Sequence, residues 1–198
     1  MRSFSFYFFA AALFAISSSP ARAANCPDSK TATKPFVVGR GGDWLVAVAH
    51  VDDTIVKTTL RSGGATLLET ILFQGLFQLD RIEEGRRRTL RPRSDLKSFF
   101  PVKVGKKIVA KFDTEESGKK SETTVELIVR ATDTLYIGAC KYDVFQIERS
   151  EARGDGAPRF VNNDYYSPDL KMVIAKEYKK AGGATNWIKY DRIYSGDR

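Results

Sequence analysis

The sequence has little of the chemistry that most metal sites and many catalytic sites require. It contains one histidine, His50, and two cysteines, Cys26 and Cys140, among 198 residues. Most zinc sites, and triads supported by accessory histidines, need more of these side chains than the chain offers. The G-x-S-x-G motif of a serine nucleophile is also absent. We therefore expect no metal, no cofactor and no catalytic residues.

Long hydrophobic runs are also missing, apart from a short one near the N-terminus. That run extends from Phe6 to Ile16, follows Arg2 and precedes Ala21-Arg22-Ala23. It is shorter than the roughly 20 residues that span a bilayer. A cationic start, a short apolar core and an A-x-A ending are typical of a secretory signal peptide. We expect residues 1–23 to be cleaved, leaving a periplasmic protein without a transmembrane anchor.

Both cysteines follow the expected cleavage site. Asn25 directly before Cys26 departs from the small residue that lipoprotein processing requires, which favours a soluble exported protein over a lipidated Cys26. In an oxidising compartment, an even pair of cysteines is most simply a disulfide. A bond between Cys26 and Cys140 would fix an extended N-terminal segment, 24–35, onto a single domain formed by 36–198.

The rest of the chain alternates between apolar and polar residues. Hydrophobic residues make up 42% and charged residues 28%, a globular composition. Positions 108, 110 and 112 are apolar, as are 125, 127 and 129, and a period of two predicts strands with one buried face. Similar stretches lie at 43–51, 54–60, 76–82, 86–91, 141–149, 158–166 and 185–194.

Turn-forming residues separate these stretches at 51–54, 61–64, 115–118 and 153–156. Many short strands joined in this way predict an all-β fold, an antiparallel meander that forms a curved sheet, half-barrel or barrel. Two segments, 66–73 and 168–180, carry apolar residues at helical spacing instead. The fold class therefore allows one short helix, and strand and helix remain open for both segments.

Three motifs in the C-terminal half resemble a family of uncharacterised bacterial periplasmic envelope proteins. They are Phe100–Lys106 (FPVKVGK), Ile137–Phe145 (IGACKYDVF) and Tyr165–Val173 (YYSPDLKMV). That family is similar to the half-barrel superfamily of periplasmic lipoprotein carriers and receptors (LolA/LolB-like). The resemblance covers about residues 95–195. It implies a curved antiparallel sheet around an apolar cavity, with 172–178 as a strand.

The leading functional hypothesis is a non-enzymatic protein of the cell envelope that binds a lipid or a lipoprotein acyl chain on the concave face of its sheet. Inward-facing apolar residues would line that face. Seven positions are the candidates for ligand binding: Phe112, Leu127, Val129, Phe145, Ile147, Val173 and Trp187.

The alternative is a structural or interaction protein that binds an envelope protein or an anionic polymer through its outer surface. The net charge is +8, and its densest source is a basic cluster within 86–93. Planar guanidinium groups suit phosphate and carboxylate partners. An exported protein without a nucleic-acid-binding motif is not expected to bind nucleic acid. The cluster consists of Arg86, Arg87, Arg88, Arg91 and Arg93.

Overall fold

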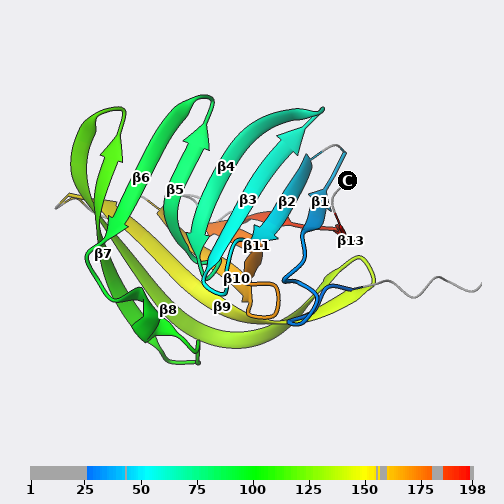
Figure 1. Ribbon diagram of the computed structural model, residues 1–198. Coiled ribbons are helices and arrows are strands. Elements are labelled where there is room, and N and C mark those ends of the chain that lie inside the picture. Colours follow the sequence, from blue (N-terminus) through cyan, green and yellow to red (C-terminus); the bar gives the residue numbers. More distant parts are fainter. Residues whose placement is uncertain (1–25, 43, 155, 157–159, 180–184, 197–198) are drawn as a thin grey trace, which may run out of the picture.

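The computed structural model describes residues 26–42, 44–154, 156, 160–179 and 185–196. The predicted signal peptide, 1–23, lies outside these residues, as does part of the predicted turn at 153–156. Within the described ranges, thirteen strands form one antiparallel sheet that curves strongly, as Figure 1 shows. The fold is all-β, as the sequence predicts.

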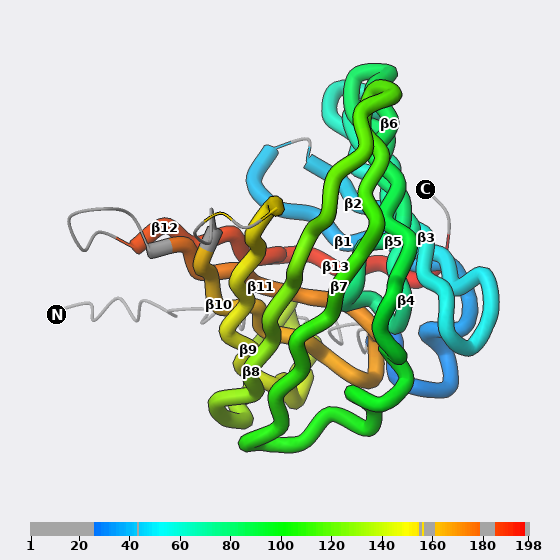
Figure 2. The backbone as a smooth tube through the Cα atoms, turned by 90° about the vertical axis from the view of Figure 1, so that its left-hand side faces the viewer, coloured from blue at the N-terminus to red at the C-terminus, as the bar shows by residue number. Residues whose placement is uncertain are grey.

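From β1 to β12 the chain forms a meander in which each strand pairs with the next, and β13 pairs with β1. The sheet order is β12-β11-β10-β9-β8-β7-β6-β5-β4-β3-β2-β1-β13. From the side, β10–β13 cross the steeper strands β3–β8 (Figure 2). The strands are β1 (Phe36–Arg40), β2 (Trp44–His50), β3 (Ile55–Ser62), β4 (Ala65–Phe73), β5 (Phe77–Glu83), β6 (Arg86–Pro92), β7 (Lys107–Glu116), β8 (Lys119–Ile137), β9 (Cys140–Arg153), β10 (Phe160–Ser167), β11 (Met172–Lys179), β12 (Thr185–Lys189) and β13 (Arg192–Ser195).

The C-terminal segment joins the two ends of this meander. Strand β12 pairs with β11, and β13 pairs with β1 at the far end of the sheet order. Only Tyr190 and Asp191 separate the two strands, and the Asp191 amide donates to the Gly39 carbonyl at 2.9 Å. A single stretch of chain thus holds the first and the last hairpins of the sheet together.

Both segments with helical spacing are strands, so the short helix that the sequence allowed at 66–73 is not formed. Strand β4 pairs along its length with β3 and β5, and β11 pairs with β10 and β12. Ladder hydrogen bonds on both sides outweigh the local helical pattern. The helix that the described residues do contain is a 3-10 turn, η1, at Leu96–Phe99.

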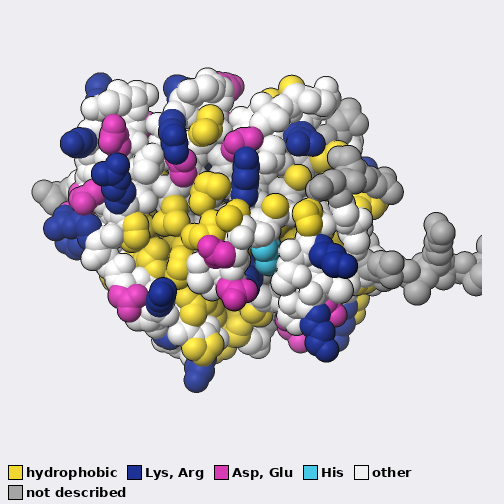
Figure 3. Space-filling view, in the orientation of Figure 1, with side chains coloured by type: hydrophobic (Ala, Val, Ile, Leu, Met, Phe, Trp, Pro, Cys, Tyr) yellow, Lys and Arg dark blue, Asp and Glu magenta, His cyan; other side chains and the backbone are white. Residues whose placement is uncertain are grey.

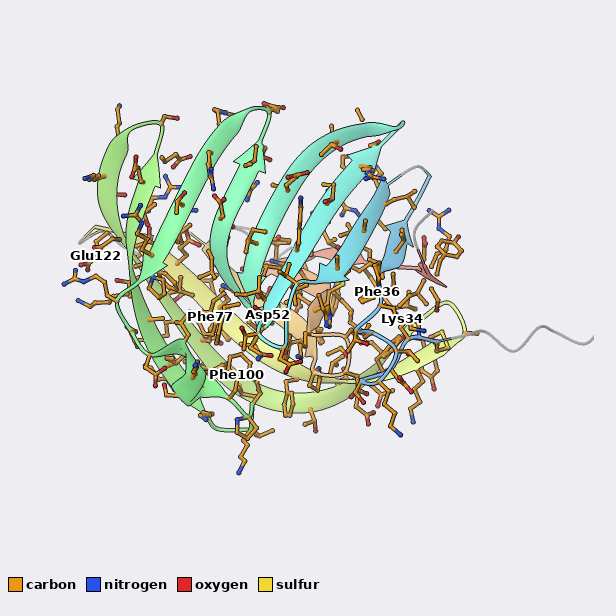
Figure 4. All side chains as sticks on the ribbon, in the orientation of Figure 1. Lys34, Phe36, Asp52, Phe77, Phe100 and Glu122 are labelled. Atoms are coloured by element: carbon orange, nitrogen blue, oxygen red, sulfur yellow. A yellow bond between two sulfur atoms is a disulfide. The ribbon has the colours of Figure 1, made fainter. Side chains whose placement is uncertain are left out.

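One hydrophobic core lies where η1 covers the inner face of β5–β8. The rings of Phe77, Phe99 and Phe100 meet edge to face at centroid distances of 5.6–6.4 Å. Such pairs add stability beyond their buried area. Hydrophobic side chains gather on this side of the molecule in Figure 3, in the region where Figure 4 labels Phe77 and Phe100.

A second core lies between β1–β3 and the C-terminal strands, and the N-terminal segment packs against it. Cys26 and Cys140 form the predicted disulfide, with an S–S distance of 2.01 Å. The sequence suggests an extended lead-in, but residues 29–33 form a turn in which the Asp28 side chain accepts hydrogen bonds from Thr31. Ala32 is buried in the core as a result.

Candidate functional site

A partly open cavity of about 500 Å³ lies between the two cores. Strands β2–β6 form one wall, and β9–β12 form the opposite wall. Its size falls in the range of about 300–1,000 Å³ that is typical of small-molecule sites. The apolar part of its lining consists of Val46, Leu60, Leu68, Leu72, Leu76, Met172, Val173, Ala175 and Ile188.

Strand register explains why these side chains face inward. Leu60 of β3 lies opposite Leu68 of β4, and Thr58 lies opposite Thr70, so every second residue faces the cavity. In β5 the pairing shifts by one residue, leaving Leu79 between paired positions. A bulge of this kind changes which face the following side chains take.

Three turns meet at one end of the cavity. Gln74 donates its amide to the Thr54 carbonyl at 2.6 Å, and Lys171 Nζ donates to the Asp53 carbonyl at 2.6 Å. His50 Nε2 lies 3.2 Å from the Leu170 carbonyl. These contacts tie together the β2–β3, β4–β5 and β10–β11 turns. Gly75 of the second turn belongs to the cavity lining, so this turn forms the floor and the other two turns pack against it.

The lining is polar where β6 of one wall approaches β9 of the other. Arg88 forms an ion pair with Glu151 at 2.7 Å, and its guanidinium also donates to Thr123 Oγ1 at 3.3 Å. The two charged side chains are only 11% and 21% exposed. Arg88 shares a face with the buried Leu90, two residues further along β6. The ion pair is therefore part of the interior.

A second charged group surrounds Asp164, whose side chain is fully buried. Arg149 Nε donates to this carboxylate at 2.6 Å, Lys176 Nζ lies 3.5 Å away, and Asn162 donates to its other oxygen. Burial opposes ionisation, but the attraction of Lys176 and Arg149 outweighs it and holds the pKa of Asp164 below its usual value. Arg149 also donates to the Leu76 carbonyl at 2.6 Å, which links the two walls.

Two donors on the cavity lining have no hydrogen-bond acceptor. Gln78 Nε2 and Arg88 Nε are both buried and without a partner in the structure. Leaving a buried donor unsatisfied is unfavourable, and such groups are uncommon in native proteins. Both donors belong to the wall formed by β5 and β6, so this wall can donate hydrogen bonds to a bound molecule.

The structure distributes the seven predicted ligand-binding residues over different places. Val173 lines the cavity. Trp187 stacks on Tyr165 at 5.1 Å and is 48% exposed. The other five belong to the core beneath η1, four fully buried and one partly buried: Phe112, Leu127, Val129, Ile147 and Phe145.

The five clustered arginines also separate. Arg87 lies on the outer side of β6, where it makes three hydrogen bonds to Asp80, whereas Arg88 points inward. Arg86 pairs with Glu84 at 3.4 Å, and Arg93 pairs with Glu122 at 2.7 Å. The alternation of a strand divides the cluster between two faces, and four of its five members already contact a carboxylate.

His50 and the neighbouring acids have structural contacts. The Asp52 carboxylate accepts hydrogen bonds from Thr54 and Ile55, which build the β2–β3 turn. Desolvation lowers the pKa of His50, which faces the Leu170 carbonyl rather than a carboxylate. The described residues contain no group of three or more His, Cys, Asp or Glu side chains able to hold a metal ion.

Most of the polar lining was not anticipated. Gln78, Arg149 and Lys176 lie in strands whose polar positions suggest solvent contact, as does Asp164, which is buried behind Arg149 and Lys176. One signal was available for Arg88, because Leu90 is the apolar residue of β6 and a residue two positions away shares its face.

No protein-family model matches this chain, and no curated protein matches it. Among solved structures, it is similar to the crystal structure of the hypothetical lipoprotein YmcC from Escherichia coli (K12). That match has 10% identity and a TM-score of 0.47, and covers 78% of this chain and 85% of the other. It does not name the lipoprotein-carrier superfamily, so that resemblance stays a prediction.

The disulfide bears on location. A disulfide is typical of exported and envelope proteins, which meet an oxidising compartment. Among the helices in the described ranges, none is long and apolar enough to cross a membrane.

Proposed function

We propose that this protein is exported to the periplasm and binds a hydrophobic or lipid-like envelope component in this partly open cavity, without catalysing a reaction. The observation that carries the proposal is the cavity itself, about 500 Å³ in volume, whose lining combines nine aliphatic side chains with polar and charged ones. A site of this kind binds by removing apolar ligand surface from water, with a few polar groups that fix orientation.

The alternative, recognition of an anionic partner through the outer arginines, has less support. On the outer face, Arg87 is held by Asp80, and Arg93 is held by Glu122. An arginine that already pairs with a carboxylate has to give up that contact before it binds another anion. The outer surface therefore offers fewer free cations than the sequence cluster suggests.

Adjacent threonines in β3 provide a matched test. Thr58 lines the cavity, whereas Thr59 lies opposite Glu69 of the outer face, and both side chains are half-buried. Thr58→Phe should reduce the cavity volume, and Thr59→Phe should add the same ring outside it. We expect fatty acyl ligands to displace the probe 1-N-phenylnaphthylamine from wild type and from Thr59→Phe. The affinity of these ligands for Thr58→Phe should be lower by at least about tenfold.

Equal affinity of the two variants would show that the cavity is not the binding site. Absence of probe binding to all three folded proteins would contradict the proposed function. Circular dichroism and thermal unfolding of each variant establish that the comparison is made between folded proteins.

A further inference from the structure

We infer that the ligand of this cavity is a single-chain amphiphile with an anionic head group, whose oxygens accept hydrogen bonds from the wall that carries Gln78 and Arg88. The inference rests on the proposed function and specifies the chemistry of the ligand. The shared feature is a carboxylate or a phosphate on one end of an apolar chain.

The first argument is the distribution of charge. Five cations belong to the lining. Four of them, Arg81, Arg88, Arg149 and Lys176, contact three carboxylates, Glu83, Glu151 and Asp164, whereas Arg40 lies over the Trp44 ring. Among these described residues, the cations therefore exceed the carboxylates by two. In an interior of low polarity, this excess favours an anion over a neutral or cationic head group.

The second argument is hydrogen bonding. Both lining groups without a partner, Gln78 Nε2 and Arg88 Nε, are donors. A neutral alcohol has one hydroxyl oxygen to offer, whereas a carboxylate or a phosphate has several acceptor oxygens. Charge-assisted bonds from arginine to such oxygens are shorter and stronger than neutral ones. The wall thus has the donors that an anionic head group needs.

The third argument is the separation of polar and apolar parts. Polar side chains of β5, β6 and β9 lie together in one part of the lining, and aliphatic side chains of β2–β4 face the cavity from the adjoining part of the sheet, beside Thr58 and Thr70. There, Leu60 of β3 lies opposite Leu68 of β4, and Leu72 of β4 lies closer to the floor of the cavity. An amphiphile matches both surfaces at once. The volume is that of a site for one small molecule, which favours one chain over several.

The test compares ligands that share a chain and differ in the head group. Dodecanoate, dodecyl phosphate and 1-dodecanol are titrated into the folded mature protein at neutral pH, and affinity is measured by displacement of the same probe. We expect at least one anion to bind about tenfold or more tightly than the alcohol. The ratio between the affinities for dodecanoate and dodecyl phosphate identifies the preferred head group as carboxylate or phosphate.

A matched pair of double substitutions locates the effect. Arg88→Met with Glu151→Gln removes an inward ion pair and leaves the net charge unchanged. This double substitution therefore tests the hydrogen-bond donors of Arg88 rather than the overall charge of the cavity. Arg87→Met with Asp80→Asn does the same for the neighbouring ion pair on the outer face of the sheet. We expect the inner double variant to lose the preference for the anion and to keep its affinity for 1-dodecanol. The outer double variant should behave as wild type.

A single substitution tests the same inference if the double variant does not fold. Gln78→Leu removes a buried donor that has no partner, so we expect a melting temperature equal to or above that of wild type, together with weaker binding of the anion. Unchanged anion affinity in both inner variants would overturn the inference.

The two proposals fail in different ways. Equal affinity of wild type for 1-dodecanol and both anions would overturn the anionic head group and leave the binding function in place. Lack of binding to all three ligands would contradict the proposed function itself.

Discussion

Gly75 lies directly against the backbone of Lys171, where the β4–β5 turn meets the β10–β11 turn. A Cβ atom at position 75 would come within 1.7 Å of the Lys171 carbonyl oxygen. Gly75 also has a positive φ of 67°, a conformation that glycine adopts without steric cost. This contact brings two distant hairpins together at the floor of the cavity.

Gly75→Ala should therefore destabilise the fold strongly, by about 3 kcal/mol or more, because backbone rather than a flexible side chain must move. Gly63 provides the control, since it also has a positive φ but no atom within 4 Å of an added Cβ. Gly63→Ala should cost only the conformational strain, about 1–2 kcal/mol. Urea unfolding measures both values, and equal losses would show that the contact with Lys171 is unimportant.

Loss of the disulfide should lower stability by about 2–4 kcal/mol, because Cys26 and Cys140 are 114 residues apart and the bond restricts the unfolded chain. The double substitution to serine tests this by urea unfolding with and without reductant. Wild type should lose stability in reductant, whereas the variant should be insensitive to it. A reductant effect on the variant would point to another cause.

Asp164 should make stability depend on pH in the acidic range. Its pKa in the folded state lies below the ordinary value of 3.8. Its contribution to the free energy of unfolding is therefore fully present above that ordinary value, and is lost as the pH falls through the lower folded pKa. Asp164→Asn should cost about 3–5 kcal/mol at neutral pH, because Arg149 and Lys176 lose their buried partner.

The difference in unfolding free energy between wild type and Asp164→Asn should therefore shrink as the pH is lowered below about 4. Urea unfolding of both proteins across that range measures it. A difference that stays constant would mean that Asp164 is not ionised in the folded protein.

Two adjacent arginines should differ in their importance for stability. Arg88→Met leaves Glu151 without its partner in the interior and should cost about 3–5 kcal/mol. Arg87→Met breaks a contact in which the arginine is exposed and should cost less than about 1 kcal/mol. Adding Glu151→Gln to the first variant should restore much of the loss. Thermal unfolding compares the three proteins, and similar costs for both arginines would refute the inward placement of Arg88.

Much of the fold follows from residue alternation. The period of two at 108–112 and 125–129 predicts strands that the structure contains as parts of β7 and β8. Strand β1 was missed, because its apolar residues Phe36, Val37 and Val38 are consecutive and show no alternation. Its residues are buried on both faces, and β2 and β13 flank it.

The site was harder to predict than the fold. In a strand, Phe112 and Leu127 show the same pattern whether they fill a core or line a cavity, and here they lie in the core beneath η1. The cavity is instead distinguished by inward polar residues such as Arg88 and Arg149, and Arg149 is held by the buried Asp164. Their placement depends on strand pairing across distant parts of the chain, which the local sequence does not specify.

The most direct test of the binding function is native mass spectrometry of the protein purified from the periplasm without detergent, before and after organic extraction. We predict an additional mass in the lipid range that extraction removes, present in wild type and in Thr59→Phe and absent or reduced in Thr58→Phe. A mass equal to that of the polypeptide alone, in a wild-type protein that also fails to bind dodecanoate, dodecyl phosphate and 1-dodecanol, would contradict it.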